Sequence, residues 1–332
     1  MTAAARSLAR AREAALAGFI VLLVIVVAAQ NGDFLSGSNL RSILLDIALI
    51  AALASAQLMV MLTRNFDLSI GSTVGLAAVT VGMICQQHGA LSTPVAYLIA
   101  IAVGLVVGLL NGFLIAWLRI PSIIFTLGML SVVRGAVYLV ADGGQVNSED
   151  VPKGLTDLST GGLLGIPPLV LIAVAVAVAV ALFLRWTRSG RSVYAVGSNP
   201  DAARLHGLPV SRTIVLVFAL SGATAGLAGA MYLSRFGFAQ ITAGSGMELT
   251  VIAAVVVGGA SIFGGSGSVA GTLLGCLLLG VIGNGFAVLG VSQYWQEAAY
   301  GALILLAVIA DQRLRARRSP ARSPETTTEA VA

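Results

Sequence analysis

Ten apolar segments follow one another along the chain and dominate what it can fold into. An α-helix needs about 20 apolar residues to cross the roughly 30 Å hydrocarbon core of a bilayer, and most of the segments are near that length. We therefore expect an all-α polytopic membrane protein with about ten transmembrane helices. The segments are 14–29, 40–62, 70–85, 95–118, 123–140, 169–184, 213–233, 249–262, 269–289 and 294–310.

The composition agrees with this class. Only 10% of the residues are charged, 58% are hydrophobic and the mean hydropathy is +0.97. A soluble domain carries about 25% charged residues, so this chain cannot cover a surface that faces water. The net charge of +5 comes from arginines that flank apolar segments, which favours a lipid bilayer over a nucleic acid as partner.

The arginines also predict the topology. Most of them lie on one side of the expected spans, and positive charge marks the cytoplasmic side. We expect a bacterial cytoplasmic-membrane protein with residues 1–13 as a cytoplasmic tail, a transmembrane domain over 14–310, and a disordered cytoplasmic tail over 311–332. The segment 14–29 fits an anchor, with a cleaved signal peptide as the alternative.

Enzyme and metal chemistry are not expected. Cys85 and Cys276 lie in separate apolar segments without metal or redox spacing. Lys153 is the only lysine and is not followed by Ser or Thr, so the chain lacks a phosphate-binding loop for ATP. We expect no catalytic residue, no metal site and no cofactor bound by this chain.

The polar break over residues 185–212 contains a short helix signature. Asn199 is a good N-cap and Pro200 suits the first helical position. Gly207 suits the left-handed residue that follows a helix. A helix this short cannot span a membrane, so we expect a rigid knob at the membrane surface. Its residues are Asn199, Pro200, Asp201, Ala202, Ala203, Arg204 and Gly207.

A weak internal repeat joins the two halves. Asn111-Gly112-Phe113 recurs as Asn284-Gly285-Phe286, and Gly128 recurs as Gly301 at the same spacing. In the expected topology the two tripeptides run in opposite directions, which predicts an inverted repeat of the kind found in transporters. Glycines spaced by four also predict close helix packing. They are Gly104, Gly108 and Gly112, Gly222 and Gly226, and Gly267, Gly271 and Gly275.

Polar residues in or beside the spans are candidates for a translocation path, because each is unfavourable in lipid. Asp67 is equally well explained as a helix cap, and Asn111 and Asn284 as contacts between helices. The candidate path residues are Asp67, Ser69, Asn111, Gln240, Thr242, Glu248 and Asn284.

Ordered motifs along the chain resemble one membrane-protein family. Residues 201–207 are similar to the EAA-x-x-x-G loop of ABC importer permeases, with Asp201 in place of Glu and without the isoleucine-leucine-proline tail. The chain resembles the permeases of ribose/xylose/arabinose-type ABC importers, and the run before Asp67 looks closest to the autoinducer-2 and rhamnose branch. The other matching segments are 67–71, 120–122, 126–128, 134–135, 190–191, 197–199, 244–249 and 257–259.

The resemblance implies a type II importer fold and a division of labour. The knob would be the coupling helix that seats in a groove of an ATPase subunit, which uses the ATP. A second permease subunit would complete the path, and an extracytoplasmic sugar-binding protein would deliver the solute. The alternative is an ion-coupled secondary transporter, which needs ionisable groups at mid-membrane, where only Asp46 and Glu297 come close.

Overall fold

The computed structural model describes residues 3–89, 91–162 and 165–316, and all its regular elements are helices. In chain order they are α1 (Ala3–Gln30), η1 (Gly32–Leu35), α2 (Gly37–Leu62), α3 (Ile70–His88), α4 (Thr93–Leu118), α5 (Ser122–Ala141), α6 (Lys153–Thr160), α7 (Pro168–Trp186), α8 (Arg188–Ser198), α9 (Pro200–Leu205), α10 (Val210–Phe236), α11 (Met247–Val257), α12 (Val269–Val288) and α13 (Gln293–Ala316). The all-α prediction is confirmed. The expected tail over 311–332 lies outside the described residues, except that α13 continues to Ala316.

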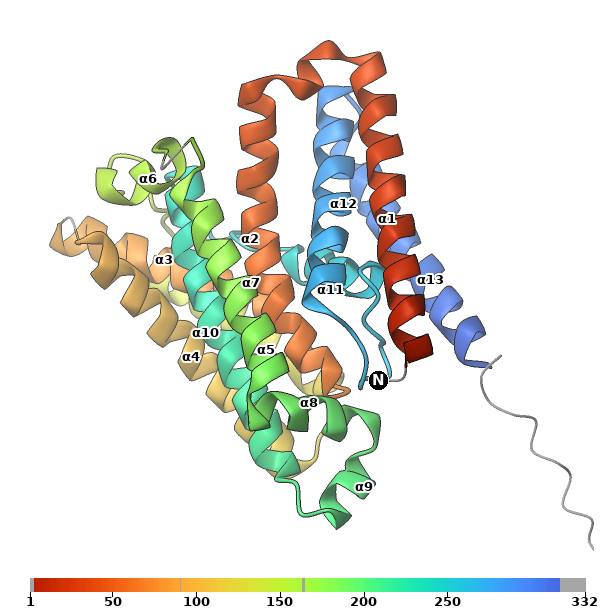
Figure 1. Cartoon of the computed structure of the whole chain (residues 1–332). Helices are drawn as coiled ribbons and strands as arrows, with labels where there is room; N and C mark the ends of the chain where they lie inside the picture. Colours follow the sequence, from red (N-terminus) through yellow and green to blue (C-terminus); the bar gives the residue numbers. More distant parts are fainter. Residues whose placement is uncertain (1–2, 90, 163–164, 317–332) are drawn as a thin grey trace, which may run out of the picture.

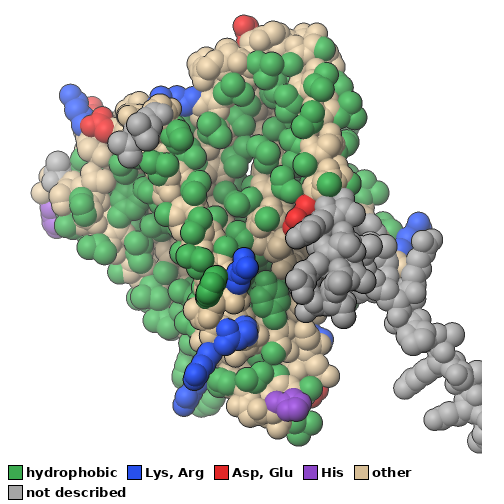
Figure 2. Space-filling view, in the orientation of Figure 1, with side chains coloured by type: hydrophobic (Ala, Val, Ile, Leu, Met, Phe, Trp, Pro, Cys, Tyr) green, Lys and Arg blue, Asp and Glu red, His purple; other side chains and the backbone are tan. Residues whose placement is uncertain are grey.

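The long helices form a bundle with distinct ends (Figure 1). η1 and α6 lie at one end, and α8 and α9 lie at the other. Within the described residues, eight helices are long and apolar enough to cross a membrane: α1, α2, α3, α4, α5, α7, α10 and α12. α2 is enclosed by other helices, since 78% of its apolar stretch is buried. α5 lies at the periphery, since only 17% of its apolar stretch is buried. Peripheral helices therefore present apolar side chains outward, as the space-filling view shows (Figure 2).

The expected span 249–262 is wrong as a full span. The helix there, α11, is only 11 residues long, which corresponds to about 16 Å, roughly half of the hydrocarbon thickness. It ends at Gly258, and the chain turns at Gly259 with φ 102°. The last expected span forms α13, which has 24 residues with polar groups at both ends and is not among the eight.

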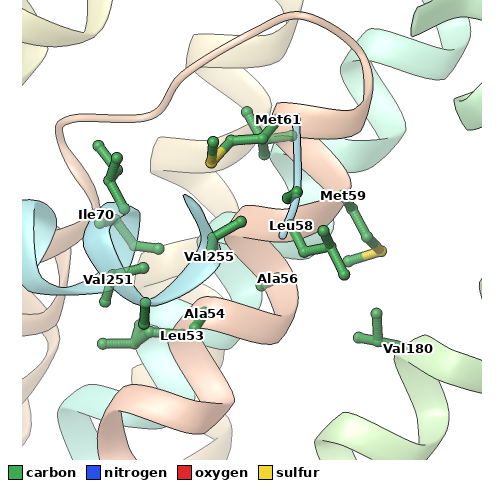
Figure 3. Close-up of a cluster of buried hydrophobic side chains, with 14 of the residues drawn as sticks. Leu53, Ala54, Ala56, Leu58, Met59, Met61, Ile70, Val180, Val251 and Val255 are labelled. Atoms are coloured by element: carbon green, nitrogen blue, oxygen red, sulfur yellow. The ribbon is translucent and has the colours of Figure 1, made fainter. Parts of the chain in front are cut away.

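The core is densest where α2 passes the beginnings of α3 and α11. Figure 3 shows Ile70 of α3 and Val251 and Val255 of α11 on the same side of α2, beside Leu53. All four side chains are fully buried or nearly so. The beginnings of α3 and α11 are thus fixed against α2.

The glycine spacing predicted close helix packing, and the structure confirms it for α4 and α10, which are each other's partners. A side chain at Gly104 or Gly108 would collide with the backbone of Gly222, and one at Gly226 with the backbone of Ala100. Helix backbones can approach this closely only where neither partner has a bulky side chain.

Two short helices were not predicted. α6 lies in the polar loop 142–165, where a helix of only 8 residues leaves little apolar periodicity. α8 lies in the first half of the polar break 185–212. Its sequence contains two glycines, which are unfavourable in a helix and more typical of a loop.

Candidate functional site

The short helix α9 has the caps that its sequence predicts. The Asn199 side chain accepts hydrogen bonds from the backbone N–H groups of Asp201 (3.1 Å) and Ala202 (3.0 Å). Pro200 opens the helix, and Gly207 follows it in a left-handed conformation with φ 74°. Because its first N–H groups have partners and its exit is fixed, α9 keeps one geometry at the end of the bundle.

The knob is fastened to the bundle through α8. The Arg64 guanidinium, just beyond α2, donates to the carbonyl oxygens of Gly197 and Ser198 at the end of α8. The Gly265 N–H donates to the Leu62 carbonyl (2.9 Å), and Gly197 packs directly on that carbonyl. Only glycine fits at position 197, because a Cβ there would overlap the Leu62 oxygen.

A second tie joins α8 to the loop before α12. The Tyr194 hydroxyl donates to the Gly267 carbonyl (3.1 Å). Burial raises the pKa of Tyr194, because desolvation disfavours the phenolate, so the hydroxyl remains a donor. These bonds connect α8, which leads into α9, to the loop 258–268 and to the end of α2.

Ala203, one of the predicted knob residues, faces its own chain. It is 5% exposed and packs on Val196 and Val210. The outward residue is Leu205, which is 89% exposed. Arg204 and Asp201 form an exposed ion pair beside it (3.0 Å). Helix periodicity alone did not identify Leu205, because a six-residue helix has no clear apolar face.

The first loop that enters the bundle, residues 63–69, is held by hydrogen bonds inside the protein. Asp67 accepts from the Ser69 N–H (3.0 Å) and the Ser69 hydroxyl (2.7 Å), and Asn111 of α4 donates to that hydroxyl (2.8 Å). Asp67 is 2% exposed, and Ser69 and Asn111 are fully buried. The structure therefore brings three predicted path residues together in a buried bridge between α3 and α4.

The hydroxyls of α5 hold the same loop from the other side. The Ser122 hydroxyl accepts from the Phe66 N–H (3.0 Å), and the Thr126 hydroxyl accepts from the Leu68 N–H (3.1 Å). These bonds satisfy partly buried backbone groups of the loop, as is required inside a membrane protein. The sequence pointed to Ser122 and Thr126 only as members of segments that resemble a family, and it did not predict that they hold this loop.

The second entering loop, residues 237–246, is held differently. Arg134 of α5 donates to the carbonyl oxygens of Ile241 (2.9 Å) and Ala243 (2.8 Å). Ala239 and Val146 exchange two backbone hydrogen bonds (2.9 and 3.1 Å). The predicted path residues on this loop, Gln240 and Thr242, have exposed side chains.

The two loops meet at Gly71 and Gly244. A Cβ at Gly71 would lie 2.5 Å from the Gly244 carbonyl oxygen, and the Glu248 carboxylate is also in contact with Gly71. Glu248 is in the first turn of α11 and beside the first turn of α3, where the helix dipoles favour a negative charge. Its Oε2 atom is buried and has no hydrogen-bond partner among the described residues.

Asn284 lies apart from the other predicted path residues. Its side chain exchanges two hydrogen bonds of 2.9 Å with Asn39, at the start of α2. A second tie lies nearby, where the Asn31 side chain, just before η1, donates to the Val288 carbonyl at the end of α12 (3.2 Å). Asn284 is one turn from the end of α12 and ties α12 to α2 near η1.

Metal-binding groups were not expected, and the described residues contain no cluster of three or more His, Cys, Asp or Glu that could hold a metal ion. The two cysteines, Cys85 and Cys276, are free and buried.

With this geometry in view, comparisons with known proteins decide the family. Residues 39–308 match the model of the branched-chain amino acid transport system / permease component family. The chain belongs to this permease family. Its membrane-spanning helices, entering loops and end knob are thus those of the permease component of an ABC importer, and ATP hydrolysis is not its own activity.

Individual relatives match over nearly the whole chain. The autoinducer 2 import system permease protein of Enterobacter sp. (strain 638) is 38% identical over 302 residues, which cover 90% of this chain and 87% of that protein. The ribose import permease protein of Escherichia coli (strain K12) is 37% identical over 302 residues, covering 89% and 92%. No solved structure matches the chain significantly.

Proposed function

We propose that this permease carries a monosaccharide or a related small polyol-like solute of the ribose, rhamnose or autoinducer-2 type. The observation that carries the proposal is the similarity, over about nine tenths of the chain, to import permeases for autoinducer 2 and for ribose. A neutral, hydroxyl-rich solute also fits the loop 237–246, which offers the uncharged Gln240 and Thr242 side chains. The Glu248 carboxylate, whose Oε2 atom has no hydrogen-bond partner among the described residues, follows in the first turn of α11.

We further propose that the knob Asn199–Gly207 is the coupling helix for an ATPase subunit. The exposed Leu205, flanked by the Asp201–Arg204 ion pair, is suited to a groove that is apolar at its centre and polar at its rim. Because Arg64, Gly197 and Tyr194 fasten α8 to the bundle, a push on the knob would move the ends of α2 and of the loop before α12 together.

The inverted repeat stays a proposal, and the helix order supports it. α2 begins 173 residues before α10, the same spacing that separates Asn111 from Asn284. The pairs α3/α11, α4/α12 and α5/α13 begin 177, 176 and 171 residues apart. α2 and α10 run in opposite directions (Figure 1), so the two entering loops would approach from opposite faces of the membrane. The knob and both termini would then be cytoplasmic, as the arginine distribution predicts.

The ion-coupled carrier receives little support from the two residues on which it depended. Asp46 is paired with Arg235 (3.2 Å), and Glu297 is exposed in the second turn of α13. A proton or sodium site needs a buried ionisable group that can exchange its ligand. Glu248 is the remaining candidate, and it lies within the electrostatic reach of Arg134.

The test is reconstitution. We expect uptake of labelled ribose, rhamnose or autoinducer 2 into proteoliposomes only when the ATPase subunits, ATP, a second permease subunit and the extracytoplasmic binding protein are all present. Leu205→Asp should abolish both ATPase co-purification and uptake while leaving the membrane level of the chain unchanged. Ser211→Asp, at an exposed position outside α9, is the matched control. Uptake driven by an ion gradient, without any ATPase, would overturn the proposal in favour of a secondary carrier.

A further inference from the structure

An apolar groove of about 430 Å³ runs along the outside of the bundle. α2 forms its floor, and α7 and α12 form its walls; these two wall helices both pack on α2 and barely touch each other. Alanines such as Ala48 and Ala177 make the groove deep, and larger residues such as Leu273 line its sides. Every residue that lines it is apolar, so water is not a suitable occupant.

The shape of the groove selects a hydrocarbon chain over a helix. Its lining on α7 extends from Val170 to Ala181, which corresponds to about 16 Å of helix. A helix with its side chains is about 10 Å wide, and over that length it would occupy about 1,300 Å³, which exceeds the roughly 960 Å³ of empty space between the groove walls. A single acyl chain can enter the groove, whereas a helix from another subunit would rest on its rims.

One end of the groove carries the groups that hold an anionic head group. Arg185 lies four residues beyond Ala181, so it continues the α7 stripe that lines the groove. Arg185 and Arg188 are exposed, and neither forms an ion pair with a described residue. Trp186, 71% exposed, lies beside Arg185, at the depth where tryptophan prefers the membrane interface. Figure 2 shows basic side chains gathered at this end of the same face.

We propose that this groove is a binding site for one anionic phospholipid, with an acyl chain between α7 and α12 and the phosphate at Arg185 and Arg188. The lipid would fill the space that α7 and α12 leave above α2. Since α7 leads directly into α8, the bound lipid would also hold the helix that carries the knob.

The proposal is tested by native mass spectrometry of the purified full-length chain with added phosphatidylglycerol or phosphatidylcholine of identical acyl chains. We expect one phosphatidylglycerol to remain bound where phosphatidylcholine is lost. The double variant R185Q/R188Q should bind phosphatidylglycerol about thirtyfold more weakly, since each arginine near a membrane surface contributes about a fivefold factor. Arg313→Gln, an exposed arginine at the end of α13, is the matched control and should bind as the wild type does.

A second variant tests the groove itself. Ala177→Trp fills it and should remove the bound lipid, whereas Leu139→Trp, on the exposed face of α5 (83% exposed), should not. Ala177→Leu should give an intermediate loss and guards against misfolding of the tryptophan variant. Equal retention of both lipids, or retention by Ala177→Trp, would overturn the site. Disulfide formation between two chains of Val174→Cys in membranes would overturn it as well, because the groove would then be an interface between copies.

Discussion

The two loops that enter the bundle, 63–69 and 237–246, are fixed by different chemistry. The first is closed: Asp67, Ser69 and Asn111 form a buried chain of hydrogen bonds, and the hydroxyls of α5 satisfy its backbone. The second is held by Arg134 and the Val146–Ala239 bridge, but its side chains Gln240 and Thr242 are exposed.

The two loops occupy corresponding positions in the proposed repeat, so the contrast between them indicates different roles. A polar group whose partners are all supplied by the protein stabilises the fold and is unavailable to a solute. Buried oxygens without a partner among the described residues occur at both loops, at Asn111 Oδ1 and Glu248 Oε2. The exposed side chains of the second loop, Gln240 and Thr242, distinguish it, because they can exchange partners with water or a solute at little cost. We therefore assign the structural role to the first loop and the solute-facing role to the second, and the following variants test this assignment.

The largest effect is expected where the two loops meet. Gly71→Val would place a side chain against the Gly244 carbonyl and the Glu248 carboxylate, so the loops must separate. Overpacking of this kind costs about 3 kcal/mol of the free energy of unfolding. We expect a strongly lowered melting temperature in detergent and loss of uptake. Gly128→Val is the control, because a Cβ at Gly128 meets nothing within 4 Å. A wild-type melting temperature for Gly71→Val would show that the loops do not depend on this contact.

The next effect separates the loops directly. Asp67→Ala leaves the Ser69 N–H and hydroxyl without their acceptor in a buried site, and such a loss costs about 1–3 kcal/mol. Gln240→Ala, at an exposed side chain, should change the free energy of unfolding by less than about 0.5 kcal/mol. Asp67→Asn retains an acceptor oxygen and should lie between the two. Equal melting temperatures for Asp67→Ala and Gln240→Ala would remove the distinction.

A smaller effect should appear in one loop only. Arg134→Gln shortens the side chain that donates to Ile241 and Ala243, and since Arg134 is partly exposed we expect a cost of about 1–2 kcal/mol. Amide hydrogen exchange should become faster over residues 238–246 and stay unchanged over 63–69. Thr126→Ala, on the same helix, should produce the opposite pattern by releasing Leu68. Faster exchange in both loops from either variant would mean that they open as one unit.

Sequence reasoning predicted the parts of this molecule that are set by local rules. The caps of α9 and the close packing of helices at Gly104 and Gly222 follow from residue types and spacing, whereas the pairing of these two glycines does not. The length of α11 was missed, although Gly258 and Gly259, the latter with φ 102°, are a local signal for the end of a helix. The inward face of Ala203 and the partnership of Asn284 with Asn39 depend on helices far away in the chain, which no local pattern encodes.

The smallest effect on stability should accompany a clear effect on transport. Glu248→Gln keeps the shape of the side chain and removes its charge; because Oε2 has no hydrogen-bond partner among the described residues, few bonds are lost. We expect a change of less than about 1 kcal/mol in the free energy of unfolding, since the lost attraction to Arg134 is offset by a lower desolvation cost. If Glu248 accepts hydrogen bonds from the hydroxyls of a passing solute, uptake should fall about tenfold, because a hydrogen bond to a charged group contributes about 1.5 kcal/mol more than none. Asn284→Asp, which changes charge at the Asn39 contact, is the comparison and should reduce stability more than uptake. Unchanged uptake by Glu248→Gln at normal membrane levels would return this residue to a packing role at the start of α11.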